Sequence, residues 1–152
     1  MTPNSSAQRG AALVELALTL PLLLVLLFAA ADFARIYYVA TELTDAARAG
    51  TQFGAKSLGT STDTAGMAAA ANAAVNVSLG SVTPLPLCYC ALDAGTAMSS
   101  ASCASGTTCA SGSHHTVWVK VTVTKVFSPV TRIPGIPASI TLTRSAMQRV
   151  LN

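Results

Sequence analysis

The chain has 152 residues, of which 51% are hydrophobic, 10% are charged and 5% are aromatic. This length can hold one compact domain and one anchor, and the composition is too apolar for an ordinary soluble domain. The formal net charge of +3 is dispersed without a cluster of Lys and Arg, so the sequence gives no support for nucleic-acid binding.

The N-terminal apolar segment is long enough to cross a membrane. No charged residue lies within residues 16–31, and Glu15 is the single charge within residues 11–31. About twenty residues at ~1.5 Å per residue cover the ~30 Å hydrocarbon core of a bilayer. Pro21 lies in the N-terminal half, where it can kink a membrane helix without ending it. We therefore predict a transmembrane helix over residues 11–34.

The helical pattern continues beyond the apolar run. A stripe of apolar and small residues recurs at alternating spacings of three and four, which is typical of a packed helix face. Its members are Ile36, Val39, Leu43, Ala46, Gly50 and Phe53. This predicts one helix over roughly residues 12–55, whose part at 35–56 packs on something outside the membrane. The alternative is a secretory signal cut after Ala31, but the carboxylate of Glu15 and the unbroken helical pattern argue against it.

Glu15 is a candidate functional residue because of its position in the apolar run. An ionised carboxylate costs roughly 2.5–3.5 kcal/mol near the centre of a bilayer. The alternative is that Glu15 reaches the interface from the first helical turn, where the helix dipole favours negative charge. A short polar stretch precedes Gly10, and four apolar residues separate Gly10 from Glu15.

This N-terminal stretch resembles the class III signal of type IV pilins and pseudopilins, which a membrane prepilin peptidase cuts after a Gly or Ala, five positions before a Glu. The resemblance implies cleavage between Gly10 and Ala11 and removal of residues 1–10 as a leader. It also implies a new ammonium group at Ala11. That cation can compensate Glu15 in the same or a neighbouring subunit, so the carboxylate becomes a contact that sets the register of assembly.

A longer stretch is similar to the TadE-like family of tight-adherence (Flp) pilus assembly. The similarity lies in residues 9–18 (RGAALVELAL), residues 21–23 (PLL) and residues 46–50 (AARAG). It implies a minor pseudopilin of a type IVb pilus system, structural in pilus biogenesis and surface adhesion. The implied location is the bacterial inner membrane, with the N-terminus cytoplasmic and the C-terminal domain periplasmic. The implied partners are the prepilin peptidase and other pilins or pseudopilins. The alternative is a membrane-anchored binding module that does not polymerise.

Residues 57–152 are expected to form a small exported domain. Asp63 or Thr62 can cap an Ala-rich helix at about 64–74. Pro84 and Pro86 are expected to interrupt regular structure, a short strand is expected at 85–92, and residues 93–113 are expected to be a polar loop.

Two further strands are predicted, at 116–127 and 139–147. The first has an apolar face of alternating valines, opposite a face with Trp118, Lys120, Thr122 and Thr124. Those valines are Val117, Val119, Val121 and Val123. In the second, Ile140 and Leu142 share one face. The predicted fold is α+β and pilin-like, with a long transmembrane helix packed on a small antiparallel sheet.

Four cysteines cluster in this domain and predict two disulfides, because an exported domain lies in an oxidising compartment. They are Cys88, Cys90, Cys103 and Cys109. A bridge within the Cys-x-Cys pair would be strained, so two connectivities remain, and each ties the loop to the strand before it. A zinc site with His114 or His115 is the alternative, but these spacings are not those of common zinc modules. We predict no metal and no cofactor.

The sequence shows no arrangement of residues typical of catalysis. The two histidines are adjacent, Asp63 and Asp93 are isolated loop acids, and no Gly-rich phosphate loop precedes a helix. We therefore expect a protein that is not an enzyme and has no small-molecule substrate.

Overall fold

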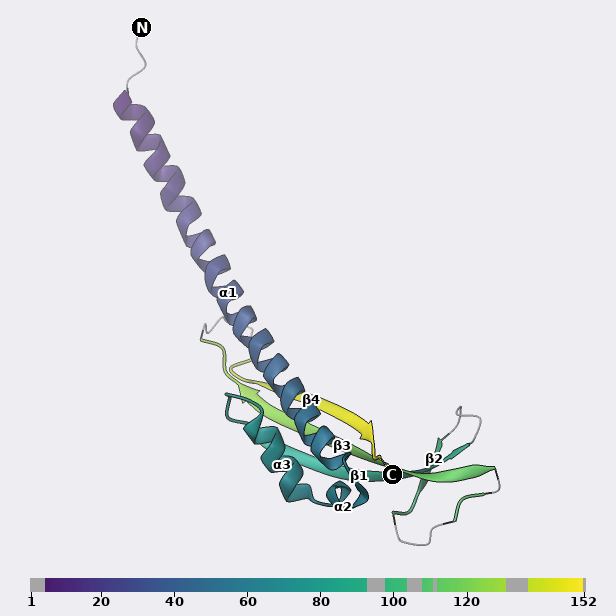
Figure 1. Ribbon diagram of the computed structural model, residues 1–152. Helices are drawn as coiled ribbons and strands as arrows, with labels where there is room; N and C mark the ends of the chain where they lie inside the picture. The colour runs from purple at the N-terminus through teal and green to yellow at the C-terminus, as the bar shows by residue number, and fades with distance from the viewer. Residues whose placement is uncertain (1–4, 93–97, 104–107, 111, 131–136, 152) are drawn as a thin grey trace.

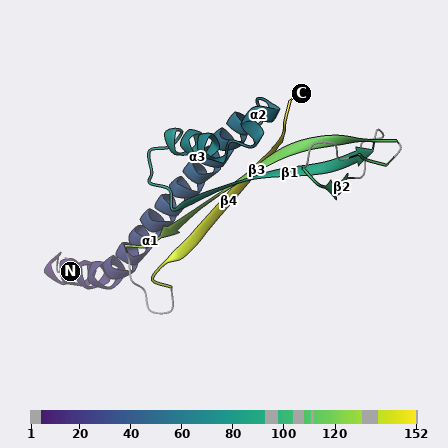
Figure 2. The ribbon, with the colours of Figure 1, turned by 90° about the horizontal axis from the view of Figure 1, so that it is seen from below.

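A computed structural model describes residues 5–92, 98–103, 108–110, 112–130 and 137–151. One long helix extends from a four-stranded antiparallel sheet, and two short helices lie on the same face of the sheet as that helix (Figures 1 and 2). The elements are α1 (Ser5–Gly54), α2 (Leu58–Ser61), α3 (Thr64–Ala73), β1 (Ser81–Leu92), β2 (Met98–Ala101), β3 (Ser113–Phe127) and β4 (Ile140–Arg149). This confirms the predicted α+β class with a long apolar helix, a small antiparallel sheet and two disulfides.

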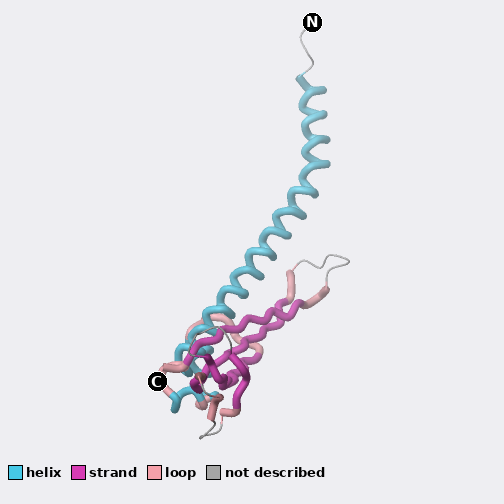
Figure 3. Tube along the Cα trace, turned by 90° about the vertical axis from the view of Figure 1, so that its right-hand side faces the viewer, coloured by secondary structure: helices cyan, strands magenta, loops and turns pink. Residues whose placement is uncertain are grey.

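Helix α1 is continuous through Gly10 and Pro21 and bends gently along its length (Figure 3). It begins at Ser5, several residues before the predicted start. Starting a helix is costly, but extending an existing one adds a hydrogen bond for each residue that becomes ordered. The polar residues before Gly10 can therefore continue the helix that the apolar run forms. The part of α1 from Ala12 onward is the one helix among the described residues that is long and apolar enough to cross a membrane.

The C-terminal half of α1 forms the core with the valine face of β3. Leu43 and Ala46 from the stripe on α1 are fully buried, as are Val119, Val121 and Val123 from β3. The prediction that the sheet covers the helical stripe is therefore confirmed. The helix covers only one face of the sheet, because the valines alternate with residues that point to the other side.

Glycines on α1 allow the neighbouring elements to approach closely. A Cβ added at Gly50 would lie 3.1 Å from the carbonyl oxygen of Met67 in α3, and one added at Gly54 would lie 2.5 Å from the Sδ atom of the same residue. Helix α3 begins with Asp63, whose carboxylate accepts the backbone N–H of Gly66 at 2.8 Å. The predicted helix at about 64–74 is confirmed.

The sheet has the order β2-β1-β3-β4 and corrects one prediction. Pro84 and Pro86 do not interrupt regular structure but lie inside β1, opposite Val121 and Val119. Strand β2 pairs with β1 only at residues 88–91, so the other side of β1 is an open edge at both prolines. An edge position tolerates a residue without an N–H.

The other predicted strands are confirmed with different ends. Strand β3 begins at Ser113, three residues earlier than predicted, and β4 continues to Arg149 rather than ending at 147. The predicted loop at 93–113 is wrong for Met98–Ala101, which forms β2. Residues 93–97, 104–107 and 111, and with them Asp93, lie outside the described residues.

Two disulfides tie β2 and its flanking residues to β1. Cys88 bonds to Cys103 and Cys90 to Cys109, with Cα–Cα distances of 5.3 and 5.6 Å. The predicted disulfides are confirmed, and the structure selects one of the two connectivities that the sequence left open. The ring of His115 lies 3.3 Å from the carbonyl oxygen of Ser102, beside this disulfide-linked region.

Candidate assembly site on the long helix

The predicted processing residues lie on the exposed N-terminal part of α1. Gly10 and Ala11 are both inside the helix, and a Cβ added at Gly10 would meet no atom within 4 Å. Glu15 follows five residues later, about 7.5 Å along the axis at the usual rise. Glycine is a weak helix former, at roughly 1 kcal/mol less favourable than alanine, so Gly10 lowers the local stability of the helix.

Glu15 is exposed on the helix surface among leucine and valine side chains. Neighbouring Leu13, Val14 and Leu16 are all more than half exposed. The hydroxyl of Thr19 donates to the backbone carbonyl of Glu15 at 3.0 Å rather than to its carboxylate. Within the described part of the chain, no hydrogen bond or ion pair reaches the Glu15 carboxylate. Inside a bilayer, this carboxylate would need a cation or water from beyond the described side chains.

A second polar cluster, which the sequence analysis did not identify, lies where α1 leaves the apolar run. Asp32 is 8% exposed, and its carboxylate pairs with Arg35 at 3.5 Å and accepts the backbone N–H of Val130 at 3.2 Å. The guanidinium of Arg35 lies 5.6 Å from the ring centre of Phe127. The segment directly after β3 is thereby fixed to the helix where the apolar run ends. An acidic residue directly after the apolar run indicates a polar contact at Asp32, but it does not identify Val130 as the partner.

Glu42 ties a second segment to α1. Its carboxylate accepts the backbone N–H of Asn76, in the connection between α3 and β1, at 3.1 Å. The negative charge of Glu42 also raises the pKa of the neighbouring Tyr38 phenol. Tyr38 therefore stays protonated to a higher pH and remains a hydrogen-bond donor beside the helix.

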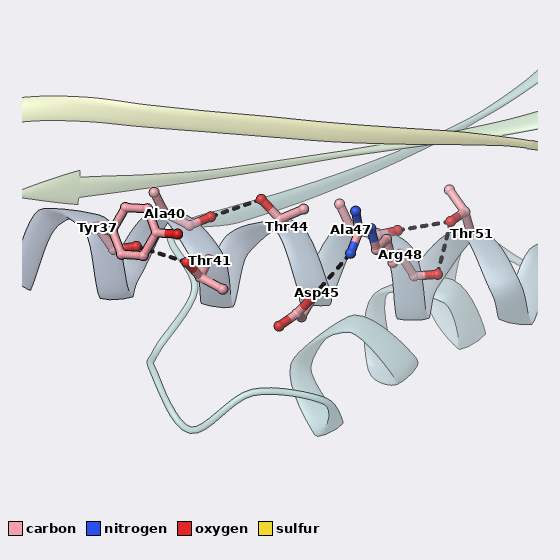
Figure 4. A network of polar contacts seen from close by, with 8 residues as sticks. All are labelled: Tyr37, Ala40, Thr41, Thr44, Asp45, Ala47, Arg48 and Thr51. Carbon is pink, nitrogen blue, oxygen red and sulfur yellow. Dashed lines mark hydrogen bonds and ion pairs between the residues drawn. The ribbon is translucent and has the colours of Figure 1, made fainter.

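The remaining polar side chains of this helical region mostly bond to the helix itself (Figure 4). The hydroxyls of Thr41, Thr44 and Thr51 each donate to the carbonyl four residues earlier, at 2.9–3.1 Å. Asp45 and Arg48 form an exposed ion pair at 3.8 Å. Such a pair contributes little to stability and lies on the solvated side of the helix. Thr51, in contrast, is buried, and its bonds within the helix satisfy its hydroxyl.

The described residues contain no group of three His, Cys, Asp or Glu side chains placed to hold a metal ion. The sites that the structure builds are contacts between elements. Among the described side chains of the apolar run, the Glu15 carboxylate is the charged group that these contacts leave for an outside partner. The arrangement suits association through the helix.

The model of the TadE-like protein family matches residues 10–52, which confirms the predicted resemblance. The match begins at Gly10 and includes Glu15, Asp32 at the end of the apolar run, and Gly50, where α3 approaches α1 closely. It ends before the sheet. No curated protein and no solved structure matches the chain. The match associates the chain with tight-adherence pilus systems and, together with the single candidate span, with a single-pass membrane protein.

Proposed function

We propose that this chain, TadE-like over residues 10–52, is a minor pseudopilin that acts structurally in the assembly of a tight-adherence (Flp, type IVb) pilus and in surface adhesion. It is not an enzyme in this proposal. The observation that carries the proposal is Glu15, a carboxylate without a partner in the described chain, on an exposed apolar helix that continues into a folded domain.

Removal of the leader after Gly10 supplies the missing partner. A prepilin peptidase would leave Ala11 as the first residue, with a free ammonium group four residues before Glu15. Residues four apart lie on the same face of a helix, about 6 Å apart along its axis. Apolar helices in lipid have no hydrophobic drive to associate, so one polar contact between neighbouring subunits can set their register.

The proposed function also implies a cellular location and a membrane topology. The N-terminus lies in the cytoplasm, α1 crosses the bacterial inner membrane, and the folded domain lies in the periplasm. The two disulfides of that domain support this orientation, since they form and persist in oxidising compartments.

The mass and N-terminal sequence of the protein from native membranes test the processing step. A chain that begins at Ala11 is expected. A chain that still begins at Met1 would leave a membrane-anchored module without pilin-type processing. A chain that begins at Asp32 would make the apolar run a secretory signal and would refute the proposal.

One observation favours the alternative of a binding module that does not polymerise. The face of the sheet opposite α1 is uncovered among the described residues, and Leu85 and Met147 on this face are 50% and 48% exposed. Lys120 lies between them in register, and Trp118 lies two residues before Lys120 on the same face of β3. Aromatic and methionine side chains are enriched in protein interfaces. Crosslinking to pilins that is lost when Glu15 is substituted would favour the pseudopilin over the binding module.

A further inference from the structure

The end of the sheet where β3 meets β4 lies beside the middle of α1 (Figure 1). The bond from the Val130 N–H to the Asp32 carboxylate joins residues that are 98 positions apart in sequence. Asp32 directly follows Ala31, the last residue of the uncharged run. The end of the sheet is therefore held at the helix position where the hydrocarbon core ends.

Large apolar side chains are exposed at this same level. Val126 and Val130, at the end of the sheet, are 60% and 73% exposed, and Phe33 and Tyr37 on α1 are 71% and 69% exposed. Aromatic residues are enriched where a protein passes through the membrane–water interface. Exposed apolar side chains gathered in one zone mark a surface that contacts an apolar partner.

A groove of about 460 Å³ opens between α1 and the end of β3 in this zone. Arg35 and Lys125 line it together with Tyr38, and none of its described lining residues carries a carboxylate. The Arg35 side chain is 53% exposed, and the Lys125 ammonium donates to the carbonyl and hydroxyl oxygens of Ser78. Arg35 lies four residues beyond Ala31, about 6 Å along the helix, which is the level of lipid headgroups.

We propose that this end of the folded domain lies on the bilayer that α1 crosses. Val126, Val130 and Phe33 enter the interface, and lipid phosphate groups bind between Arg35 and Lys125. The partner is the lipid surface rather than another protein, because the Asp32–Val130 bond fixes these side chains at the membrane boundary. This inference requires α1 to span the bilayer, but it does not depend on pilus assembly.

Quenching of tryptophan fluorescence by brominated lipids tests the apolar contact in the full chain, reconstituted in nanodiscs of phosphatidylcholine and phosphatidylglycerol. Backbone hydrogen bonds place the native Trp118 near the C-terminal end of α1. The carbonyl oxygen of Val117, the residue before Trp118, accepts the N–H of Val150. The N–H of the next residue, Leu151, donates to the carbonyl oxygen of Ala55. Ala55 lies 24 residues beyond Ala31, about 36 Å away along a helix. Trp118 should therefore not be quenched.

The probe is Val130→Trp in a Trp118→Phe background, and the matched control is Leu58→Trp in the same background. Leu58 is also an exposed apolar residue, at 53%, but it lies in α2 at the far end of the domain. Strong quenching is expected for the substitution at Val130 and none for that at Leu58. Equal quenching at both positions would overturn the proposal.

The phosphate contact has its own test with the same fluorescent probe. Quenching at Val130 should increase when phosphatidylglycerol replaces part of the phosphatidylcholine, and Arg35→Gln with Lys125→Gln should abolish that increase. Arg48→Gln, which removes an exposed cation farther along α1, should preserve it. An undiminished increase in the double variant would overturn the assignment of anionic lipid headgroups to this groove.

Discussion

The close packing of α1 against α3 and β3 at Gly54 gives a quantitative prediction for Gly54→Ala. The added Cβ would lie 2.5 Å from Sδ and 3.1 Å from Cγ of Met67, and 3.0 Å from Cγ1 of Val119. Both neighbours are fully buried, so neither can move into solvent. Overpacking of a filled core typically costs about 1–3 kcal/mol. The better helix propensity of alanine offsets at most about 1 kcal/mol, and less at the last residue of a helix.

The free energy of unfolding should therefore fall by about 1–2 kcal/mol. For a domain of this size each kcal/mol changes the melting temperature by roughly 4–8 °C, so the loss should be roughly 5–15 °C. Thermal unfolding of the full chain in detergent micelles, with disulfides intact, measures this through Trp118. It is the single tryptophan, and it lies in β3 directly before the buried Val119.

Gly59→Ala is the matched control, because it makes the same chemical change in α2. There the added Cβ would meet only the Ser57 hydroxyl oxygen, at an ordinary contact distance of 3.8 Å. The control should be neutral or stabilising by up to about 1 kcal/mol. If Gly54→Ala melts at or above the temperature of the wild type, the close approach of Met67 and Val119 is not a constraint on the fold.

Three further predictions concern processing, assembly and the disulfides. Gly10→Leu should block leader removal but leave insertion intact, so mass spectrometry of membrane protein should show the full-length chain; a normally shortened chain would move the cut elsewhere. Glu15→Ala should insert and be cleaved like the wild type but lose crosslinking to pilins in native membranes. Glu15→Gln should lose it as well, because it keeps the size of the side chain without the charge, and equal crosslinking in all three forms would remove Glu15 from assembly. Thiol labelling of denatured, unreduced protein should find no reactive cysteine, whereas two labelled cysteines would contradict the pairing of Cys88 and Cys90 with Cys103 and Cys109.

The features that the sequence predicted correctly depend on local periodicity. The stripe on α1 repeats with the period of a helix, and the valines of β3 alternate with the period of a strand. Each pattern therefore predicts a buried face without knowledge of its partner. Asp63 likewise predicts a helix start from its own side chain. Because each of these two apolar faces needs a partner that covers it, the sequence also predicts that the stripe on α1 packs against the valine face of β3.

The features that the sequence did not predict depend on distant segments. Pro84 and Pro86 fit in β1 because β2 stops short of them, and that edge exists only after the sheet has formed. Strand β2 has no alternating pattern of its own and depends on pairing with β1 and on the disulfides. The bond between Asp32 and Val130 spans 98 positions and has no local signature. The roles of Gly10, Ala11 and Glu15 stay predictions, because they involve a peptidase and neighbouring subunits.

One continuous helix makes the proposed assembly contact and the proposed membrane contact mechanically dependent on each other. Glu15 and Asp32 lie on the same α1, so moving Glu15 along the membrane normal by one turn moves the sheet by the same ~5.4 Å. A subunit whose Glu15 meets a neighbour's ammonium at a different height must therefore lift Val130 out of the interface and Arg35 away from the lipid phosphates. Assembly then competes with the contact that holds the domain on the bilayer. Variants that weaken the lipid contact, such as Arg35→Gln with Lys125→Gln, should increase crosslinking through the N-terminal helix rather than decrease it.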